Sequence, residues 1–544
     1  MRKILIPVVV LLTALGSCKK YLDINSTNPN SPTTSTPELV LGASISRTAS
    51  SLIGYNDYGS WMVGYQANAG GYGGWGASLT YNFGTSNYTG LWGTYDILTD
   101  FQYVLDKTSD SDPYSYYNAI ARIMKVFNFK LLVDEYDAIP YFEALKGSAN
   151  TTPAYTPAEE IYKDLYKQLD TAIATINNAT QPLALTYSLG NADPMFNGNM
   201  TRWKQFANTL KLKLLVRASK TSVFTGVTPS FDPAGFLTTD VLVNPGYIKA
   251  AGQQNPHWNS YHSSATNAGA ARSIISTFYI ATFYNGITIS DSARRRAIYR
   301  PSSASDYDPV RNQLGEVGPI VDNRLAPGGS SVWYSGSGSA YDFKDDPSNA
   351  IGILKGRGQS EVVLLAAESY FLQAEAQMKG ILTGGDVTDL FNKGIEASFK
   401  YLYQSADGTY KVNTYISPAA PNPTAAAEHY HVEGDNATKY LVNIELATSD
   451  EQRLEAIITQ KYIALNMISG QEAWDEYKRT GYPKIDNAGL DPNKTFVSKA
   501  SQATTVDKLV GRIWYPSSEY SLNPKNAPTN ISVFGSFVFY DRRK

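Results

Sequence analysis

Cysteine is almost missing from this sequence, because Cys18 is the only one among 544 residues. A chain with one cysteine cannot close an internal disulfide, so packing alone has to hold its fold. The chain is long enough for that, since 43% of its residues are apolar and a body of this size buries a sizeable core. The composition therefore excludes a small disulfide-stapled scaffold and a disordered chain.

An excess of charge of either sign is also missing. The chain has 47 Lys and Arg against 49 Asp and Glu, a formal net charge of −2. Such a chain has neither the basic footprint that binds nucleic acid nor a polybasic patch for an anionic lipid surface. No segment after the first fifteen residues approaches about eighteen uninterrupted apolar residues, so we expect no membrane-spanning helix.

Common catalytic signatures are missing as well. The sequence has no G-x-x-x-x-G-K-[ST] phosphate loop, no G-x-S-x-G nucleophile elbow and no H-E-x-x-H zinc motif. Residues 71–76 match G-x-G-x-x-G, but a dinucleotide site needs a strand before this motif and a helix after it, and we predict neither. We therefore expect a binding protein and not an enzyme.

Histidines and acidic residues gather in several places without forming a metal pattern. We interpret the groups around His257 and His431 as exposed polar loops, the acidic residues 134–143 as helix caps and ion pairs, and the basic triplet 294–296 as a solvated face. No metal and no cofactor is predicted, although scattered oxygen ligands leave a calcium ion open.

Cys18 follows a segment typical of an export signal. Arg2 and Lys3 precede an apolar run over 4–15, which is too short to span about 30 Å of hydrocarbon, and small residues stand just before the cysteine. This order resembles the bacterial lipobox, in which the cysteine sulfur carries diacylglycerol. We expect a signal peptide over 1–17, a lipid anchor on Cys18, a flexible leash over 18–37 and a body over 38–544.

Helical spacing of apolar residues dominates the body. The pattern predicts a helical frame over 91–220 and 360–480, with helices in antiparallel pairs joined by short links. Capping boxes are predicted at Thr156 with Glu159 and at Ser449 with Gln452. The expected helices cover 38–53, 91–107, 113–133, a helix that begins after Thr156, 199–219, 361–379, 386–403, 450–468 and 470–479.

Three stretches interrupt this frame. Residues 54–90, 222–350 and 404–448 are rich in Gly, Ser, Pro or Asn and show few helical stripes, so we predict irregular insertions there. Long loops inside a compact body are usually functional. The sequence therefore predicts a mostly α fold that carries large irregular insertions.

Several segments, in order along the chain, resemble the SusD/RagB family of lipoproteins. The resemblance covers nearly the whole chain beyond Cys18, and its segments are specific as a set. They are CKKYLDIN at 18–25, DEYDAIPYFEA at 134–144, AAESYFLQAEA at 366–376, ITQKYIAL at 458–465, EAWDEYKRTG at 472–481 and RIWYPSSEYSLN at 512–523.

The resemblance implies a SusD-like fold of tetratricopeptide-like helix pairs. It also implies an outer-membrane lipoprotein that faces the cell exterior and captures nutrients, most often oligosaccharides and sometimes peptides. The partner that it implies is a SusC-like TonB-dependent barrel transporter.

Aromatic side chains in the irregular stretches are the candidates for ligand contact. A flat ring can stack on the apolar C–H face of a pyranose, while amides and hydroxyls bond its polar rim. The alternative is that the same rings pack between helices. The candidate ligand-binding residues are Tyr72, Trp75, Trp61, Tyr65, Tyr81, Trp258, Tyr261, Trp333 and Tyr334.

Three other functions stay open on the sequence. The same scaffold could bind oligopeptides, since Tyr is a general recognition residue and the chain has 39 of them. A surface glycoside hydrolase would need two carboxylates about 5–10 Å apart. A purely structural lid would bind no ligand of its own.

Overall fold

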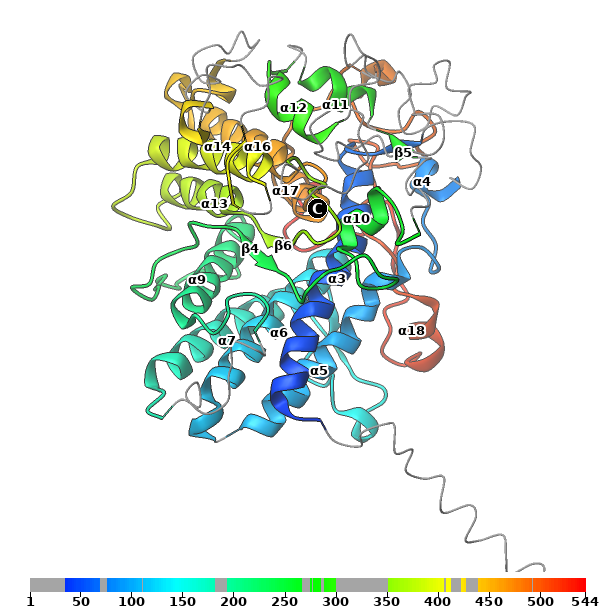
Figure 1. Cartoon of the computed structure of the whole chain (residues 1–544). Coiled ribbons are helices and arrows are strands. Elements are labelled where there is room, and N and C mark those ends of the chain that lie inside the picture. Colours follow the sequence, from blue (N-terminus) through cyan, green and yellow to red (C-terminus); the bar gives the residue numbers. More distant parts are fainter. Residues whose placement is uncertain are drawn as a thin grey trace, which may run out of the picture.

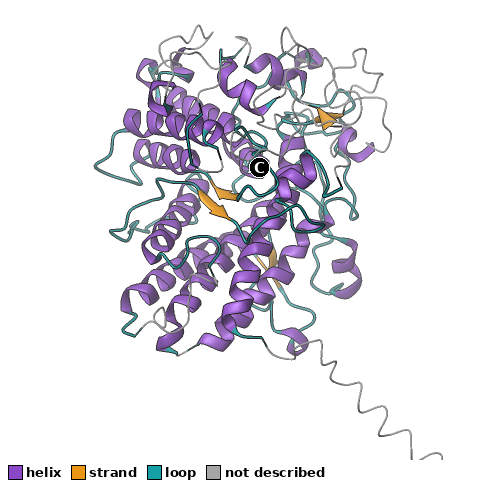
Figure 2. Cartoon of the chain, viewed as in Figure 1, coloured by secondary structure: helices purple, strands orange, loops and turns teal. Residues whose placement is uncertain are grey.

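Helices dominate the fold, and the few strands are short (Figure 2). The computed structural model describes residues 35–68, 76–109, 111–181, 193–266, 274–275, 277–284, 288–299, 351–405, 408–411, 422–426, 439–491 and 493–544. Within these ranges no helix combines the length and the apolarity needed to cross a membrane. The prediction of a mostly helical fold is confirmed.

The long helices follow the predicted stripes. Apolar residues that recur at helical spacing in α6 (Ser115–Tyr136) and α7 (Ala158–Asn178) are buried: Ile120, Met124, Phe127 and Leu131 in α6, and Ile161, Leu165, Leu169 and Ile173 in α7. The longer helices are α3 (Pro37–Met62), α5 (Thr94–Thr108), α6 (Ser115–Tyr136), α7 (Ala158–Asn178), α9 (Met200–Arg217), α13 (Ala366–Met378), α14 (Val387–Tyr403), α16 (Asp450–Leu465) and α17 (Gly470–Thr480).

Short elements connect this frame. The short α-helices are α4 (Gly76–Thr80), α10 (Pro256–Tyr261), α11 (Phe278–Phe283), α12 (Ser292–Ile298) and α18 (Ser517–Leu522). Single 3₁₀ turns cover Thr89–Gly93, Asp112–Tyr114, Gly147–Ala149, Lys439–Leu441, Ile444–Leu446 and Ala488–Leu490. In the described part of the chain, three antiparallel strand pairs join β1 (Ala67–Asn68) with β5 (Ile274–Ile275), β2 (Ile139–Pro140) with β3 (Tyr155–Thr156), and β4 (Val241–Val243) with β6 (Glu361–Leu364).

Successive helices pack on one another in two groups. Helices α5, α6, α7 and α9 form the lower group in Figure 1, and α13, α14 and α16 form the upper group. The groups meet where α9 packs on α13. Helix α3 contacts both α5 and α17, so the first helix of the described chain ties the early helices to a late one.

Two glycines allow α3 and α17 to cross closely. A Cβ atom on Gly59 would lie 2.2 Å from the carbonyl carbon of Gly470, and a Cβ on Gly470 would lie 2.3 Å from the hydroxyl of Ser60. No side chain fits into these distances, so the crossing requires glycine at both positions.

A buried charge cluster lies where both helix groups meet. The carboxylate of Glu472 in α17 is 2.8 Å from Lys213 and from Arg217 of α9, and 2.9 Å from Lys461 of α16. Lys130 of α6 is 3.8 Å away. All five side chains are buried, so this charge cluster connects four helices inside the core.

The structure departs from the predicted elements at three places. Helix α3 continues over 54–62, which the sequence assigns to an irregular insertion, because its small and aromatic residues pack against α17 and α5. Residues 361–364 form β6 and not the first turn of a helix, since they pair with β4. The predicted cap at Thr156 is wrong, because Thr156 pairs in β3 and Pro157 is the residue that precedes α7.

Candidate functional site

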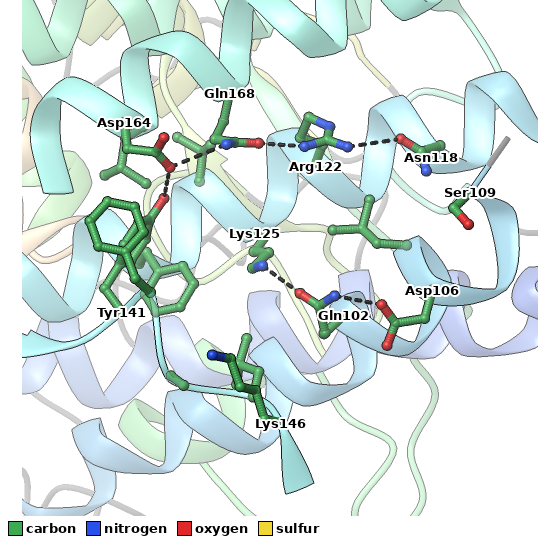
Figure 3. A pocket seen from close by; sticks show the side chains of 17 residues that line it. Gln102, Asp106, Ser109, Asn118, Arg122, Lys125, Tyr141, Lys146, Asp164 and Gln168 are labelled. Atoms are coloured by element: carbon green, nitrogen blue, oxygen red, sulfur yellow. Dashed lines mark hydrogen bonds between the residues drawn. The ribbon is translucent and has the colours of Figure 1, made fainter. Parts of the chain in front are cut away.

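A pocket of about 500 Å³ lies between α5, α6, α7 and the loop that follows β2 (Figure 3). This volume falls within the range of about 300–1,000 Å³ that is typical of small-molecule sites. The side chains around it are mainly polar and come from both the helices and the loop.

Helix α6 supplies the central wall of the pocket. Asn118, Arg122, Lys125 and Phe129 follow one another at steps of four, three and four, so they share one face of the helix. Their neighbours Ile120, Met124, Phe127 and Leu131 bury the other side in the core. The core packing of α6 therefore fixes the direction of its polar face.

Two further helices add pairs at a spacing of four. Gln102 and Asp106 lie one turn apart on α5, and Asp164 and Gln168 lie one turn apart on α7. Each pair presents a carboxylate and an amide to the same cavity.

The loop after β2 supplies an aromatic wall. The Tyr141 ring packs edge-on against Phe129, with 4.6 Å between centroids, and against Phe142, with 4.9 Å. Phe142 is 54% exposed, so one ring of this wall is open to solvent. Leu145 in the same loop has a φ of 63°, a left-handed backbone that a bulky residue seldom adopts.

A chain of hydrogen bonds joins Asp164 of α7 to Arg122 of α6. The Tyr141 hydroxyl donates to Asp164 Oδ2 at 2.6 Å, and Gln168 Nε2 donates to the same oxygen at 3.2 Å. Arg122 donates to the side-chain oxygen of Gln168 and, at 3.4 Å, to Asn118 Oδ1. Figure 3 shows this chain crossing the site from Asp164 to Asn118.

A second chain of hydrogen bonds joins Lys125 of α6 to Asp106 of α5. Lys125 donates to Gln102 Oε1, and Gln102 Nε2 donates to Asp106 Oδ1 at 2.7 Å. In both chains a glutamine stands between the cation and the carboxylate. Among the described residues, no carboxylate lies within ion-pair distance of Arg122 or Lys125.

Burial shifts the protonation of the groups in this pocket. Burial, with a further contribution from the charge of Arg122, lowers the pKa of Lys125 to about 8. Burial also lowers the pKa of the Arg122 guanidinium, whereas burial and the Asp164 carboxylate raise the pKa of Tyr141. At neutral pH the pocket thus offers cations, carboxylates and neutral amides together, an arrangement suited to holding a polar ligand.

Five of the predicted ligand contacts are described, and all five lie in the core. Each is 4% exposed or less, so a ligand reaches these rings only if the surrounding side chains move. Their surroundings agree with the alternative interpretation, in which these rings pack between helices. Their role as ligand contacts stays a prediction. The five residues are Trp61, Tyr65, Tyr81, Trp258 and Tyr261.

Protein partners already occupy the polar atoms of three of these rings. The Tyr65 hydroxyl donates to the backbone oxygen of Tyr462, and the Tyr81 hydroxyl accepts from the backbone N–H of Ser498 at 3.1 Å. The Tyr261 hydroxyl accepts from Gln66 at 3.3 Å. These hydrogen bonds join segments far apart in the sequence, so the three tyrosines help to hold the fold together.

The remaining predicted residues lie outside the described part of the chain. They are the lipid-anchor residue Cys18, the ligand candidates Tyr72, Trp75, Trp333 and Tyr334, and the histidines His429 and His431.

Two expectations of solvent exposure are wrong. Arg294 and Arg295 of the basic triplet are 0% and 7% exposed, and Arg294 donates to Asp291 at 2.6 Å, because α12 packs on α14. His257 and His262 are also buried. Across the described residues, no group of three or more His, Cys, Asp or Glu side chains is arranged to hold a metal ion.

Sequence reasoning missed the pocket altogether. The apolar stripe of 113–133 predicts only the buried face of this helix, and the acidic residues 134–143 predict caps and ion pairs, not a pocket wall. A signal was present, because Asn118, Arg122 and Lys125 repeat at helical spacing and Tyr141-Phe142 follows the same helix. The spacing alone does not show that α5 and α7 leave a cavity beside this face.

Comparisons with known proteins give one family and one fold. Residues 29–501 match the model of the SusD-like family, which is described as starch-binding and associating with the outer membrane. No curated protein matches this chain.

Solved structures share the fold at low sequence identity. A SusD homologue from Bacteroides fragilis is 21% identical and superposes with a TM-score of 0.65, covering 90% of this chain and 95% of its own. A chitin-binding SusD homologue from Flavobacterium johnsoniae is 23% identical, with a TM-score of 0.62 and coverage of 89% and 92%. A SusD homologue from Bacteroides uniformis is also 23% identical, with a TM-score of 0.62 and coverage of 92% and 99%.

The family match spans most of the chain, and the helical architecture agrees with it. This chain belongs to the SusD-like family.

Proposed function

We propose that this protein is a nutrient-binding lipoprotein of the outer membrane that captures oligosaccharides at the cell surface. The observation that carries the proposal is the pocket, whose ring wall of Tyr141 and Phe142 faces amides, carboxylates and cations. A sugar has the same two characters, an apolar face and a polar rim. The family's description as starch-binding and the chitin-binding homologue support this ligand class.

Binding is tested on the full chain with Cys18→Ser, which stays free of lipid. Isothermal titration against a panel of neutral and acidic oligosaccharides and of oligopeptides should give saturable binding to glycans. Binding to peptides alone would favour the oligopeptide alternative, and binding to neither class would overturn the proposal. The proposed contacts in the irregular stretches are tested on the same panel with Trp75→Ala and Trp333→Ala.

Capture without catalysis is part of the proposal. The glycans that bind are incubated with the protein, and the reaction products are separated by chromatography. We expect intact glycan after prolonged incubation, whereas any shorter product that a heat-treated sample does not release would show a hydrolase.

The anchor is proposed to be Cys18, acylated after removal of residues 1–17. Cells that express the full chain and are fed an alkyne-labelled fatty acid should yield labelled protein, and Cys18→Ala should abolish the label. Protease added to intact cells should degrade the anchored protein if it faces the exterior.

The proposed partner is a SusC-like TonB-dependent barrel that receives the captured glycan. The expected result is co-purification of a TonB-dependent barrel from the same membranes with the acylated protein in detergent. Failure of the two to co-purify from membranes that contain both would contradict this partner.

A further inference from the structure

The pocket between α5, α6 and α7 carries an unusual charge arrangement. Three cations, Arg122, Lys125 and Lys146, line it together with two carboxylates, Asp106 and Asp164. The chain as a whole has a formal net charge of −2, so this local excess of positive charge runs against the overall balance.

Neither Arg122 nor Lys125 of α6 has an anionic partner among the described residues. Lys125 donates to Gln102 and Arg122 donates to Gln168 and Asn118, and all three acceptors are neutral amide oxygens. The Nε of Arg122 is shielded from solvent and has no hydrogen-bond partner. A hydrogen bond to a charged acceptor is roughly twice as strong as one between neutral groups, so both cations are poised to gain from an anion.

Burial makes the absence of a counter-ion beside Arg122 and Lys125 energetically costly. A half-buried cation without an opposite charge is disfavoured, and burial accordingly lowers the pKa of Lys125 to about 8. The two carboxylates do not relieve the cost fully, because glutamines keep them beyond ion-pair distance. An anion placed between α6 and the loop would relieve it.

We infer that this pocket binds the carboxylate-bearing sugar of an acidic glycan, a uronic acid unit. This inference rests on the proposed function and names its substrate class. Arg122, Lys125 and Lys146 take the carboxylate, and the exposed ring of Phe142 stacks on the C–H face of the sugar. Asp106 and Asp164 accept hydrogen bonds from its hydroxyls.

The mixed charges of the pocket favour a uronic acid over other anions. A phosphate group carries close to two negative charges and would be repelled by Asp106 and Asp164. It also offers no apolar face to Phe142. A neutral sugar would satisfy the carboxylates and the ring but leave Arg122 and Lys125 without a counter-charge.

The test compares acidic trimers with their methyl esters, in which neutral ester groups replace the charged carboxylates. Trimers of galacturonate, glucuronate and mannuronate are titrated into the full chain with Cys18→Ser, each beside its methyl ester. The expected result is that at least one trimer binds about tenfold more tightly than its ester. Inorganic phosphate serves as an anion without a sugar and should not displace the bound trimer.

Variants place the effect in this pocket. Arg122→Gln should weaken the acidic trimer about tenfold and leave its ester unchanged. Lys146→Gln should weaken binding of the acidic trimer about two- to fivefold. Lys146 is exposed, so this variant should fold like the wild type. Lys107→Gln is the matched control, because it removes an exposed charge from α5 outside the pocket and should change nothing.

The outcomes separate this inference from the proposed function. Equal binding of acid and ester, or binding that Arg122→Gln and Lys146→Gln both leave unchanged, overturns the uronate inference while glycan capture still stands. Displacement of the trimer by phosphate at similar concentration also overturns it, in favour of a simple anion site. Absence of binding to every glycan removes both proposals.

Discussion

His257 is held between an acid and a backbone carbonyl. Its Nδ1 lies 3.1 Å from Glu361 Oε1 in β6, and its Nε2 faces the backbone oxygen of Met467 at 2.5 Å. Burial works against a charge here, but the Glu361 carboxylate and the hydrogen bonds outweigh it and raise the pKa of His257. With an acceptor at both nitrogens, the ring is stabilised in its protonated form.

This pair gives the protein a pH-dependent stability. A raised histidine pKa adds stability below the unfolded value of about 6.5, and that stability is lost as the pH rises through the folded value. His257→Gln should therefore cost most below pH 6.5, and its difference from wild type should shrink at higher pH. Thermal unfolding measured from pH 5 to 9 tests this, and a difference that grows with pH would contradict it. Glu361→Gln should flatten the same pH dependence.

Trp258 and Phe142 differ in burial, so their variants distinguish a ring that packs the core from a ring at the surface. Trp258 is 1% exposed and stacks on His262 with 3.9 Å between centroids, whereas Phe142 is 54% exposed. Trp258→Ala should lower the free energy of unfolding by about 3–5 kcal/mol. Phe142→Ala should change it by less than about 0.5 kcal/mol, because no packed contact is lost from the core. Urea unfolding of both variants tests the contrast, and equal effects would contradict it.

At the scale of elements, the crossing of α3 and α17 depends on glycine. Gly59→Ala places a methyl group 2.2 Å from the backbone of Gly470, so the helices have to separate. The expected cost is about 1–3 kcal/mol in the free energy of unfolding. Gly54→Ala is the matched control in the same helix, since its Cβ would meet only Leu91 at 3.7 Å. We expect that control to be neutral or to stabilise by about 0.4–1 kcal/mol, and equal costs for both variants would contradict the crossing.

The same glycines show what sequence patterns could and could not predict. Helices with an apolar stripe, such as α6 and α7, were placed to within a few residues, and the cap at Ser449 is confirmed by its bond from the N–H of Gln452. Gly59 favoured a loop in the sequence, because a glycine that serves a helix crossing looks the same as one that serves a turn. The helix partner that distinguishes them lies more than 400 residues away.

The site was less predictable than the fold for a related reason. Aromatic rings among glycines suggested ligand contacts, yet Trp61, Tyr65 and Tyr81 fill the core. Burial depends on which distant segments meet, as when the Tyr81 hydroxyl accepts from Ser498. The pocket likewise exists only because three helices and one loop leave a space, which no local pattern contains.

At the scale of the whole molecule, the charge cluster around Glu472 joins the two helix groups. Burial opposes the charge, but Arg217, Lys213 and Lys461 hold the pKa of Glu472 well below its usual value. Cations from α6, α9 and α16 thus share one carboxylate of α17. Loss of that carboxylate would leave several buried cations without compensation.

Glu472→Gln should therefore destabilise the protein by about 3–5 kcal/mol at neutral pH. A depressed carboxylate pKa adds stability above the unfolded value, so the cost should shrink as the pH falls below about 4.3. Denaturant unfolding at pH 7 and at pH 4 checks both expectations. Asp389→Asn is the control, because its pair with Lys393 is about half exposed on both sides and should cost less than about 1 kcal/mol.

The contact between α3 and α17 also sets an order of events in biosynthesis. The side-chain oxygen of Asn56 accepts the backbone N–H of Gly470 at 2.8 Å, across 414 positions of the chain. A polypeptide that leaves the ribosome from its N-terminus can make this contact only after residue 470 of 544 has been synthesised, by which time α5, α6, α7 and α9 are already complete.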